Sequence, residues 1–91
     1  MSHYVYIIKS QKDGTYYVGS TQDVEKRLTR HNQGRSKYTK AKIPWKLVFS
    51  EKFPDRSAAV KRELQIKSRK DRNYIANLIR ASRHADRKSV V

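Results

Sequence analysis

The fold is decided by the stretch Tyr4-Val5-Tyr6-Ile7-Ile8, which Asp13-Gly14 separates from Thr15-Tyr16-Tyr17-Val18-Gly19. Both flanking runs are rich in β-branched and aromatic residues, which favour strands. The first run has no polar residue at alternating positions, so we expect a strand that is covered on both faces. The Asp-Gly pair between the runs is typical of a two-residue hairpin turn.

The hairpin turn also predicts a register. If Asp13 and Gly14 form the turn, Ser10 lies opposite Tyr17 and Ile8 lies opposite Gly19. Directly opposed residues share a face of the ribbon. One face is therefore predicted to carry Tyr4, Tyr6, Ile8, Tyr17 and Gly19. Gly19 would be a diagonal neighbour of Tyr6, and its missing side chain would leave a hollow beside that phenol.

The remaining elements follow from periodicity and from start and stop signals. Thr21 is predicted to cap a helix near residues 22–33, and residues 34–44 form a polar, basic loop. We predict strands near 3–10, 15–20 and 45–51, and helices near 22–33, 57–70 and 72–82. The predicted fold class is α+β, a small three-stranded antiparallel sheet flanked by helices in the order β-β-α-β-α-α. Residues 1–83 form the expected single domain, and residues 84–91 a flexible tail.

Charge is the first indication of function. The chain has 91 residues, of which 22 are Lys or Arg and eight are Asp or Glu, for a net charge of +14. Most of this charge falls after residue 25. A balance this basic favours a polyanionic partner, and nucleic acid is the usual one.

Composition excludes several other classes of protein. No apolar run reaches the ~18 residues of a transmembrane helix, and the N-terminus does not resemble a cleaved signal peptide. The chain has no Cys, so it has no disulfide, thiolate zinc site or Cys nucleophile. These features agree with a cytoplasmic protein that does not contact membranes, and we expect a monomer.

The acidic residues are too scattered for a two-metal hydrolase, and no metalloprotease, P-loop or serine-hydrolase motif occurs. Glu63 stands apart because it lies in the middle of a predicted helix. It either balances the neighbouring Lys61 and Arg62 in solvent or binds a single metal ion. Arg27 and His31 are four residues apart and project from one helix face, where positive charge would favour a tyrosine phenolate.

In this order the motifs resemble the GIY-YIG nucleases, which carry two short motifs on adjacent strands. Tyr4-Val5-Tyr6 is similar to the first motif, with Tyr4 in place of Gly, and Tyr17-Val18-Gly19 is similar to the second, with Val for Ile. Arg27 and His31 fall at the family's positions on the first helix, and Glu63 falls at its metal-ligand position. The resemblance covers roughly residues 3–80 and is closest to small standalone bacterial members.

The resemblance implies a metal-dependent endonuclease that hydrolyses phosphodiester bonds in nucleic acid, with DNA as the expected substrate. It implies one Mg²⁺ ion on Glu63, a water activated by Tyr6, and charge neutralisation by Arg27. Tyr17 and His31 would assist Tyr6. Many members also carry a late active-site Asn, for which Asn77 is the best match.

Each assignment has a structural alternative. Tyr6 and Tyr17 could be core aromatics, and His31 could cap its helix instead. Trp45 is expected in the core, and His3 and His84 are expected to take no part. The residues expected to contact nucleic acid are Arg30, Lys37, Tyr38, Lys40 and Lys42, and the loop among them could equally be a solvated segment. Two alternative functions also stand: a nucleic-acid-binding module without catalysis, and an adaptor for an acidic protein.

Overall fold

The computed structural model describes the backbone of residues 2–69 and 71–90 and the side chains as far as residue 82. The element order confirms the predicted β-β-α-β-α-α arrangement. The strands are β1 (His3–Ser10), β2 (Tyr16–Thr21) and β3 (Trp45–Phe53). The helices are α1 (Val24–Asn32), α2 (Arg56–Arg69) and α3 (Arg72–Val90), with a short 3₁₀ turn, η1 (Lys40–Lys42), before β3. Among the described residues, no helix is long and apolar enough to cross a membrane.

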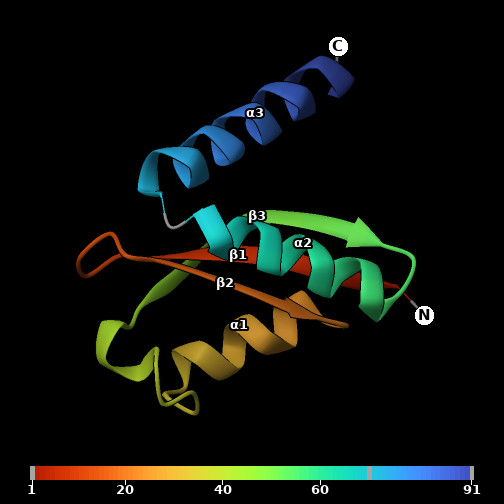
Figure 1. Ribbon diagram of the computed structural model, residues 1–91. Helices are drawn as coiled ribbons and strands as arrows, with labels where there is room; N and C mark the ends of the chain where they lie inside the picture. The colour runs from red at the N-terminus through yellow and green to blue at the C-terminus, as the bar shows by residue number, and fades with distance from the viewer. Residues whose placement is uncertain (1, 70, 91) are drawn as a thin grey trace.

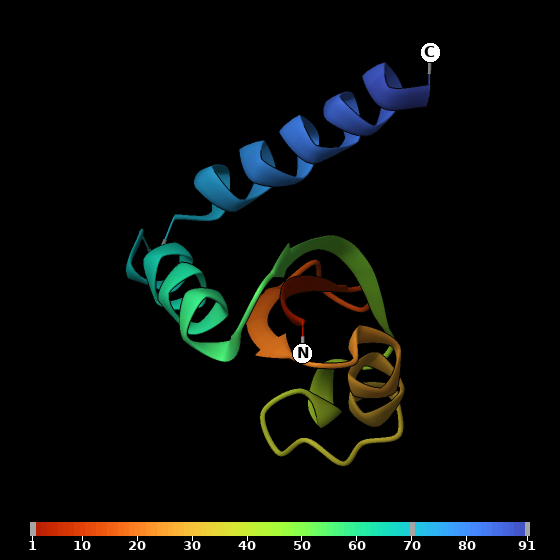
Figure 2. The same cartoon turned by 90° about the vertical axis from the view of Figure 1, so that its right-hand side faces the viewer.

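The three strands form one antiparallel sheet in the order β2-β1-β3, so β1 is the central strand. Helix α1 covers one face of this sheet, and α2 and α3 lie on the opposite side (Figure 1). The view turned by 90° shows the sheet between the two helical layers (Figure 2). The fold is therefore the small α+β sandwich that the sequence predicts.

Strand β1 is buried on both faces, as its unbroken apolar sequence predicts. Val5 and Ile7 are fully buried with Phe49 and with residues of α2 and α3. Tyr6 and Ile8 point to the other face, where they pack against Trp45 and α1. Two small cores thus share one strand, and Trp45 belongs to the core as expected.

The hairpin register differs from the predicted register by two residues. Ile8 lies opposite Tyr17, and Tyr6 lies opposite Gly19. The connection is a longer loop of residues 11–15, closed by backbone hydrogen bonds from the Ser10 amide to Thr15 and from the Gly14 amide to Ser10. A shift of two preserves the faces, because side chains alternate with a period of two. The predicted face is therefore correct, although the predicted pairs are wrong.

Gly19 lies directly under the Tyr6 ring rather than diagonal to it. A Cβ atom at position 19 would lie 2.6 Å from the phenol oxygen and 2.8 Å from the ring carbon that carries it. Both distances are too short for a real contact. The glycine is therefore required by space, and it lets the phenol rest on the backbone of β2.

The first helix begins later than predicted, and a different residue caps it. Asp23 is the N-cap, and its Oδ1 accepts a hydrogen bond from the Lys26 amide at 3.0 Å. The Thr21 hydroxyl instead accepts a hydrogen bond from the amide of Asp23. Thr and Asp can both cap a helix. Because strand β2 extends through Thr21, the helix begins later and Asp23 is its N-cap.

The last helix is longer than predicted. Apolar periodicity stops near residue 82, but α3 continues to Val90. Residues 83–90 include Ala, Arg and Lys, which favour helix without an apolar stripe, and periodicity alone missed them. The domain boundary at residue 83 and the flexibility of the tail stay predictions. Three residues at the limits of predicted segments lie outside the described residues. They are Met1 of the domain 1–83, Lys70 of the helix 57–70 and Val91 of the tail 84–91.

We predict that Gly19→Ala destabilises the protein by about 1–3 kcal/mol, because the new methyl group would overpack against the Tyr6 ring. Urea denaturation of the variant and the wild type measures this difference. The effect of Gly19→Ala should be smaller in a Tyr6→Ala background, where the ring is absent. Equal stability of Gly19→Ala and the wild type would contradict the close approach of ring and backbone.

Candidate active site

A cavity of about 830 Å³ lies beside the centre of the hairpin, between α1 and α2. Tyr6 from β1, Tyr17 from β2, Arg27 from α1 and Glu63 from α2 all line it. Four of the five residues predicted as catalytic thus come to one place, and the fifth, His31, lies behind Tyr6.

Tyr6 contributes a buried phenol to the cavity. Its hydroxyl lies 3.0 Å from Nε2 of His31, and the nearby Arg27 guanidinium favours the ionised phenol. Burial and the neighbouring Tyr17 raise the pKa of Tyr6 above its usual value, and Arg27 only partly offsets this. The expected cationic field is therefore insufficient, and the phenol stays protonated at neutral pH.

His31 is a buried, neutral partner of Tyr6. Only 2% of the residue is exposed, and its Nδ1 lies 2.8 Å from the hydroxyl of Thr39. Burial and the charges of Arg27 and Arg30 lower the pKa of His31 below 6.5. His31 therefore adds no positive charge at neutral pH, which corrects the expectation that it helps to form a phenolate. Its ring nitrogens face Tyr6 and Thr39 and do not cap the helix end.

Glu63 reaches the cavity from α2 across the edge strand β2. The Ser20 hydroxyl donates a hydrogen bond to Oε1 at 2.8 Å, and the Lys67 ammonium donates one to Oε2 at 2.6 Å. The Glu63 side chain is only 17% exposed. Glu63 is therefore not the solvated acid of the first alternative, and its role as a metal ligand stays a prediction.

The cavity carries an excess of positive charge, which sequence reasoning recognised only in part. Its lining includes the cationic residues Lys26, Arg27, Arg30 and Arg56 and the acidic residues Asp23 and Glu63. Lys26, Arg56 and Ser20 were not predicted. The sequence could have predicted Arg56, because its spacing places it on the same helix face as Glu63. That face follows the i, i+4, i+7, i+11 positions Arg56, Val60, Glu63 and Lys67.

The basic loop predicted to contact nucleic acid lies apart from the cavity. Of the described residues in the loop 35–44, none lines it. Tyr38 is 86% exposed, and Lys37 and Lys40 are exposed beside it. Lys42 is held instead by Asp13, whose carboxylate lies 2.7 Å from its ammonium. The Lys42 ion pair and the Lys42 carbonyl, which accepts from Ser10, tie this loop to the hairpin loop.

Two further residues differ from their expected places. His3, which was expected to take no part, lines the cavity. Asn77, the best match for a late active-site Asn, is exposed on α3 and does not line the cavity. The side chain of His84 lies outside the described residues.

The buried neutral His31 predicts a pH dependence of stability. Its pKa is lower in the folded protein than in the unfolded chain, so the unfolded chain binds more protons as the pH falls through about 6.5. The free energy of unfolding should therefore decrease from pH 7 to pH 5. Urea denaturation across this range should show a weaker pH dependence of the free energy of unfolding for His31→Asn than for the wild type. The same pH dependence in His31→Asn and the wild type would contradict this assignment.

The amino-acid sequence is similar to those of bacterial proteins named UPF0213. It is 49% identical over 67 residues to a UPF0213 protein of Staphylococcus saprophyticus, an alignment of 72% of this chain and 80% of the relative. It is 46% identical over 68 residues to a UPF0213 protein of Staphylococcus aureus, which covers 74% and 82% of the two chains.

The structural comparison agrees with the sequence comparison. The solution NMR structure of a UPF0213 protein from Bacillus halodurans matches with a TM-score of 0.57 and 35% identity, over 89% of this chain and 85% of that chain. The family model of the GIY-YIG catalytic domain matches residues 2–75. This match spans the hairpin, the cavity and all of α2. The chain therefore belongs to the GIY-YIG family.

Proposed function

We propose that the protein is a divalent-metal-dependent endonuclease that hydrolyses phosphodiester bonds in nucleic acid, with cytoplasmic DNA as the expected substrate. One observation carries the proposal: a phenol, a guanidinium and a carboxylate from three elements, Tyr6, Arg27 and Glu63, line one cavity. These groups match a base, a charge-neutralising group and a metal ligand for phosphodiester hydrolysis.

The donor set of the cavity suits magnesium. Mg²⁺ binds proteins through one or two carboxylates and keeps several waters, and Glu63 supplies a carboxylate at the cavity wall. The described residues contain no cluster of three or more acidic or histidine side chains, which agrees with a single-carboxylate site. When bound, the ion would supply Lewis-acid stabilisation of the phosphate and of the leaving oxygen.

Tyr6 and His31 together can act as a base where Tyr6 alone cannot. The raised pKa of Tyr6 makes a free phenolate rare at neutral pH, but His31 is neutral and lies 3.0 Å from the phenol. If Nδ1 carries the His31 proton, Nε2 can accept the phenol proton as Tyr6 takes one from the attacking water. The edge of the Tyr17 ring packs against His31, with ring centroids 5.0 Å apart, and holds the imidazole in place.

Cations at the cavity supply the rest of the chemistry. Arg27 lies at the phenol, where it can donate to a phosphate oxygen and offset the charge that develops in the transition state. Lys26, Arg30 and Arg56 line the same cavity and can hold the flanking phosphates. Outside the cavity, exposed Tyr38 offers a ring on which a base can stack.

A binding module without catalysis is the second candidate, and one observation favours it. Both carboxylate oxygens of Glu63 already have protein partners, Ser20 and Lys67. A protein that only grips the phosphate backbone would need the same cations and no free metal ligand.

We predict that the purified protein cuts at least one member of a panel of linear, nicked, flapped and branched nucleic acids with Mg²⁺ or Mn²⁺, and none with EDTA. Glu63→Gln should abolish cleavage. Tyr6→Phe should slow it about 10²–10⁴-fold, and Arg27→Ala about 10²–10³-fold. A cleavage assay beside a gel-shift assay measures both properties.

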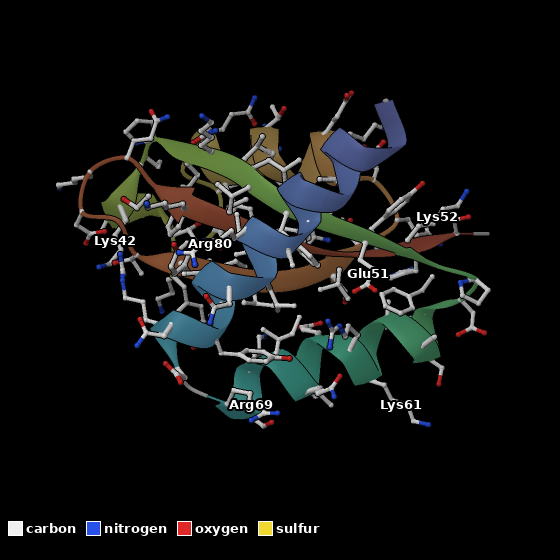
Figure 3. All side chains as sticks on the ribbon, turned by 90° about the horizontal axis from the view of Figure 1, so that it is seen from above. Lys42, Glu51, Lys52, Lys61, Arg69 and Arg80 are labelled. Carbon is white, nitrogen blue, oxygen red and sulfur yellow. The ribbon has the colours of Figure 1, made fainter. Side chains whose placement is uncertain are left out.

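Glu51→Gln is the matched control, because Glu51 lies on the other face of the sheet between β3 and α2 (Figure 3), where it pairs with Arg62. This variant should cleave at the wild-type rate. Cleavage by Glu63→Gln at that rate would rule out the metal ligand. Binding without cleavage across the whole panel would favour the binding module.

We also predict a steep salt dependence of nucleic-acid binding. Six cations, four in the cavity and Lys37 and Lys40 in the loop, would give a log–log slope of about −4 to −5. Arg30→Ala with Arg56→Ala should reduce this slope by about 1.4–1.8, whereas Lys46→Ala should leave it unchanged. Fluorescence anisotropy between 50 and ~300 mM salt is the measurement, and a flat response would exclude a phosphate-binding surface.

A further inference from the structure

The side chain of Lys67 contacts one of the two carboxylate oxygens of Glu63, the proposed metal ligand, from outside the set of residues that line the cavity. Its ammonium lies 2.6 Å from Oε2, while the Ser20 hydroxyl donates to Oε1. Oε1 keeps a free lone pair beside a neutral donor, but Oε2 faces a full positive charge. In this state the carboxylate already has a counter-ion of its own chain.

The geometry of this pair makes it displaceable. Glu63 and Lys67 are four residues apart on α2, with Glu N-terminal to Lys, which is the favourable orientation on a helix. The Lys67 side chain is 46% exposed and can rotate into solvent. Such a pair holds its partners in place without a large free-energy cost for separation.

An ammonium and a divalent cation cannot share one carboxylate oxygen at close range, because their charges repel. The cavity offers little compensation. Its other acid, Asp23, is committed by Oδ1 to capping α1, and the remaining charged lining residues are cations. The free protein should therefore bind a divalent cation weakly, and a bound phosphate would supply the anionic ligand that the metal and the displaced ammonium both require.

We propose that Lys67 is a built-in counter-ion of Glu63 that competes with the divalent cation and makes binding of metal and nucleic acid mutually dependent. This inference rests on the proposed metal site at Glu63. A bound phosphate backbone would offer the Lys67 ammonium a phosphate oxygen in place of Oε2, and Oε2 would then be available to hold a metal ion. Linkage requires the reciprocal effect, so metal also strengthens nucleic-acid binding.

The test is Mn²⁺ binding in the absence of nucleic acid, followed by water-proton relaxation and by broadening of the Ser20 amide signal. Lys67→Met keeps the length of the side chain and removes its charge, so it should lower the dissociation constant for Mn²⁺ about two- to fivefold. Lys67→Arg keeps the charge and should bind as the wild type does. Lys61→Met is the matched control, because Lys61 is an exposed cation of the same helix that points away from the sheet (Figure 3).

The second measurement repeats the Mn²⁺ titration with a short DNA duplex in a Tyr6→Phe background, which suppresses cleavage. The duplex should tighten Mn²⁺ binding, and Lys67→Met should reduce that gain. An equal effect of Lys67→Met and Lys61→Met, or no effect of Lys67→Met, would overturn the role of Lys67. The outcomes separate the two proposals: Mn²⁺ binding that Glu63→Gln leaves unchanged would overturn the metal site itself.

Discussion

The contact between the Tyr6 ring and the backbone of Gly19 is the constraint on which the site depends. No side chain fits at position 19, because its Cβ would lie 2.6 Å from the phenol oxygen. The ring therefore packs against the backbone of β2, where its hydroxyl contacts His31 and lies near Arg27, both on α1. Tyr6 and Gly19 both line the cavity of about 830 Å³.

The central strand connects this site to the core. Alternate residues of β1 face opposite sides, so Val5 and Ile7 anchor α2 and α3 while Tyr6 and Ile8 anchor α1. The helices on both faces of the sheet are thus held in fixed positions relative to the Tyr6 phenol. Glu63 reaches that phenol's cavity only because α2 packs along the outer strand β2, where Ser20 holds the carboxylate. Rigid packing by both cores places three chemical groups that are far apart in the sequence.

The site combines a positively charged cavity with a neutral pair of side chains, Tyr6 and His31. Cations line the cavity and would attract phosphate. Burial, together with the charges of Arg27 and Arg30, lowers the pKa of His31 and keeps the histidine neutral. Burial keeps the phenol protonated in spite of Arg27. Tyr6 and His31 therefore form a neutral pair that can exchange a proton. The positive charge of the site alone would instead predict a Tyr6 phenolate. Lys67 adds a positive charge directly at the Glu63 carboxylate.

Residue types and local spacing were enough to predict much of the fold and part of the candidate site. Apolar residues on both faces of residues 4–8 required a covered strand, and alternation placed Tyr6, Tyr17 and Gly19 on one face even with the pairing two residues off. Local rules could not choose the loop length, because backbone hydrogen bonds within residues 10–15 and the tie between Lys42 and Asp13 closed a wider loop than Asp-Gly predicts. They also could not exclude Asn77, which lies on α3 and does not line the cavity. The neutral state of His31, the raised pKa of Tyr6 and the Ser20 contact to Glu63 arise from burial between elements distant in the sequence. Desolvation and long-range contacts exist only once the chain is folded, so they were decided by the tertiary structure.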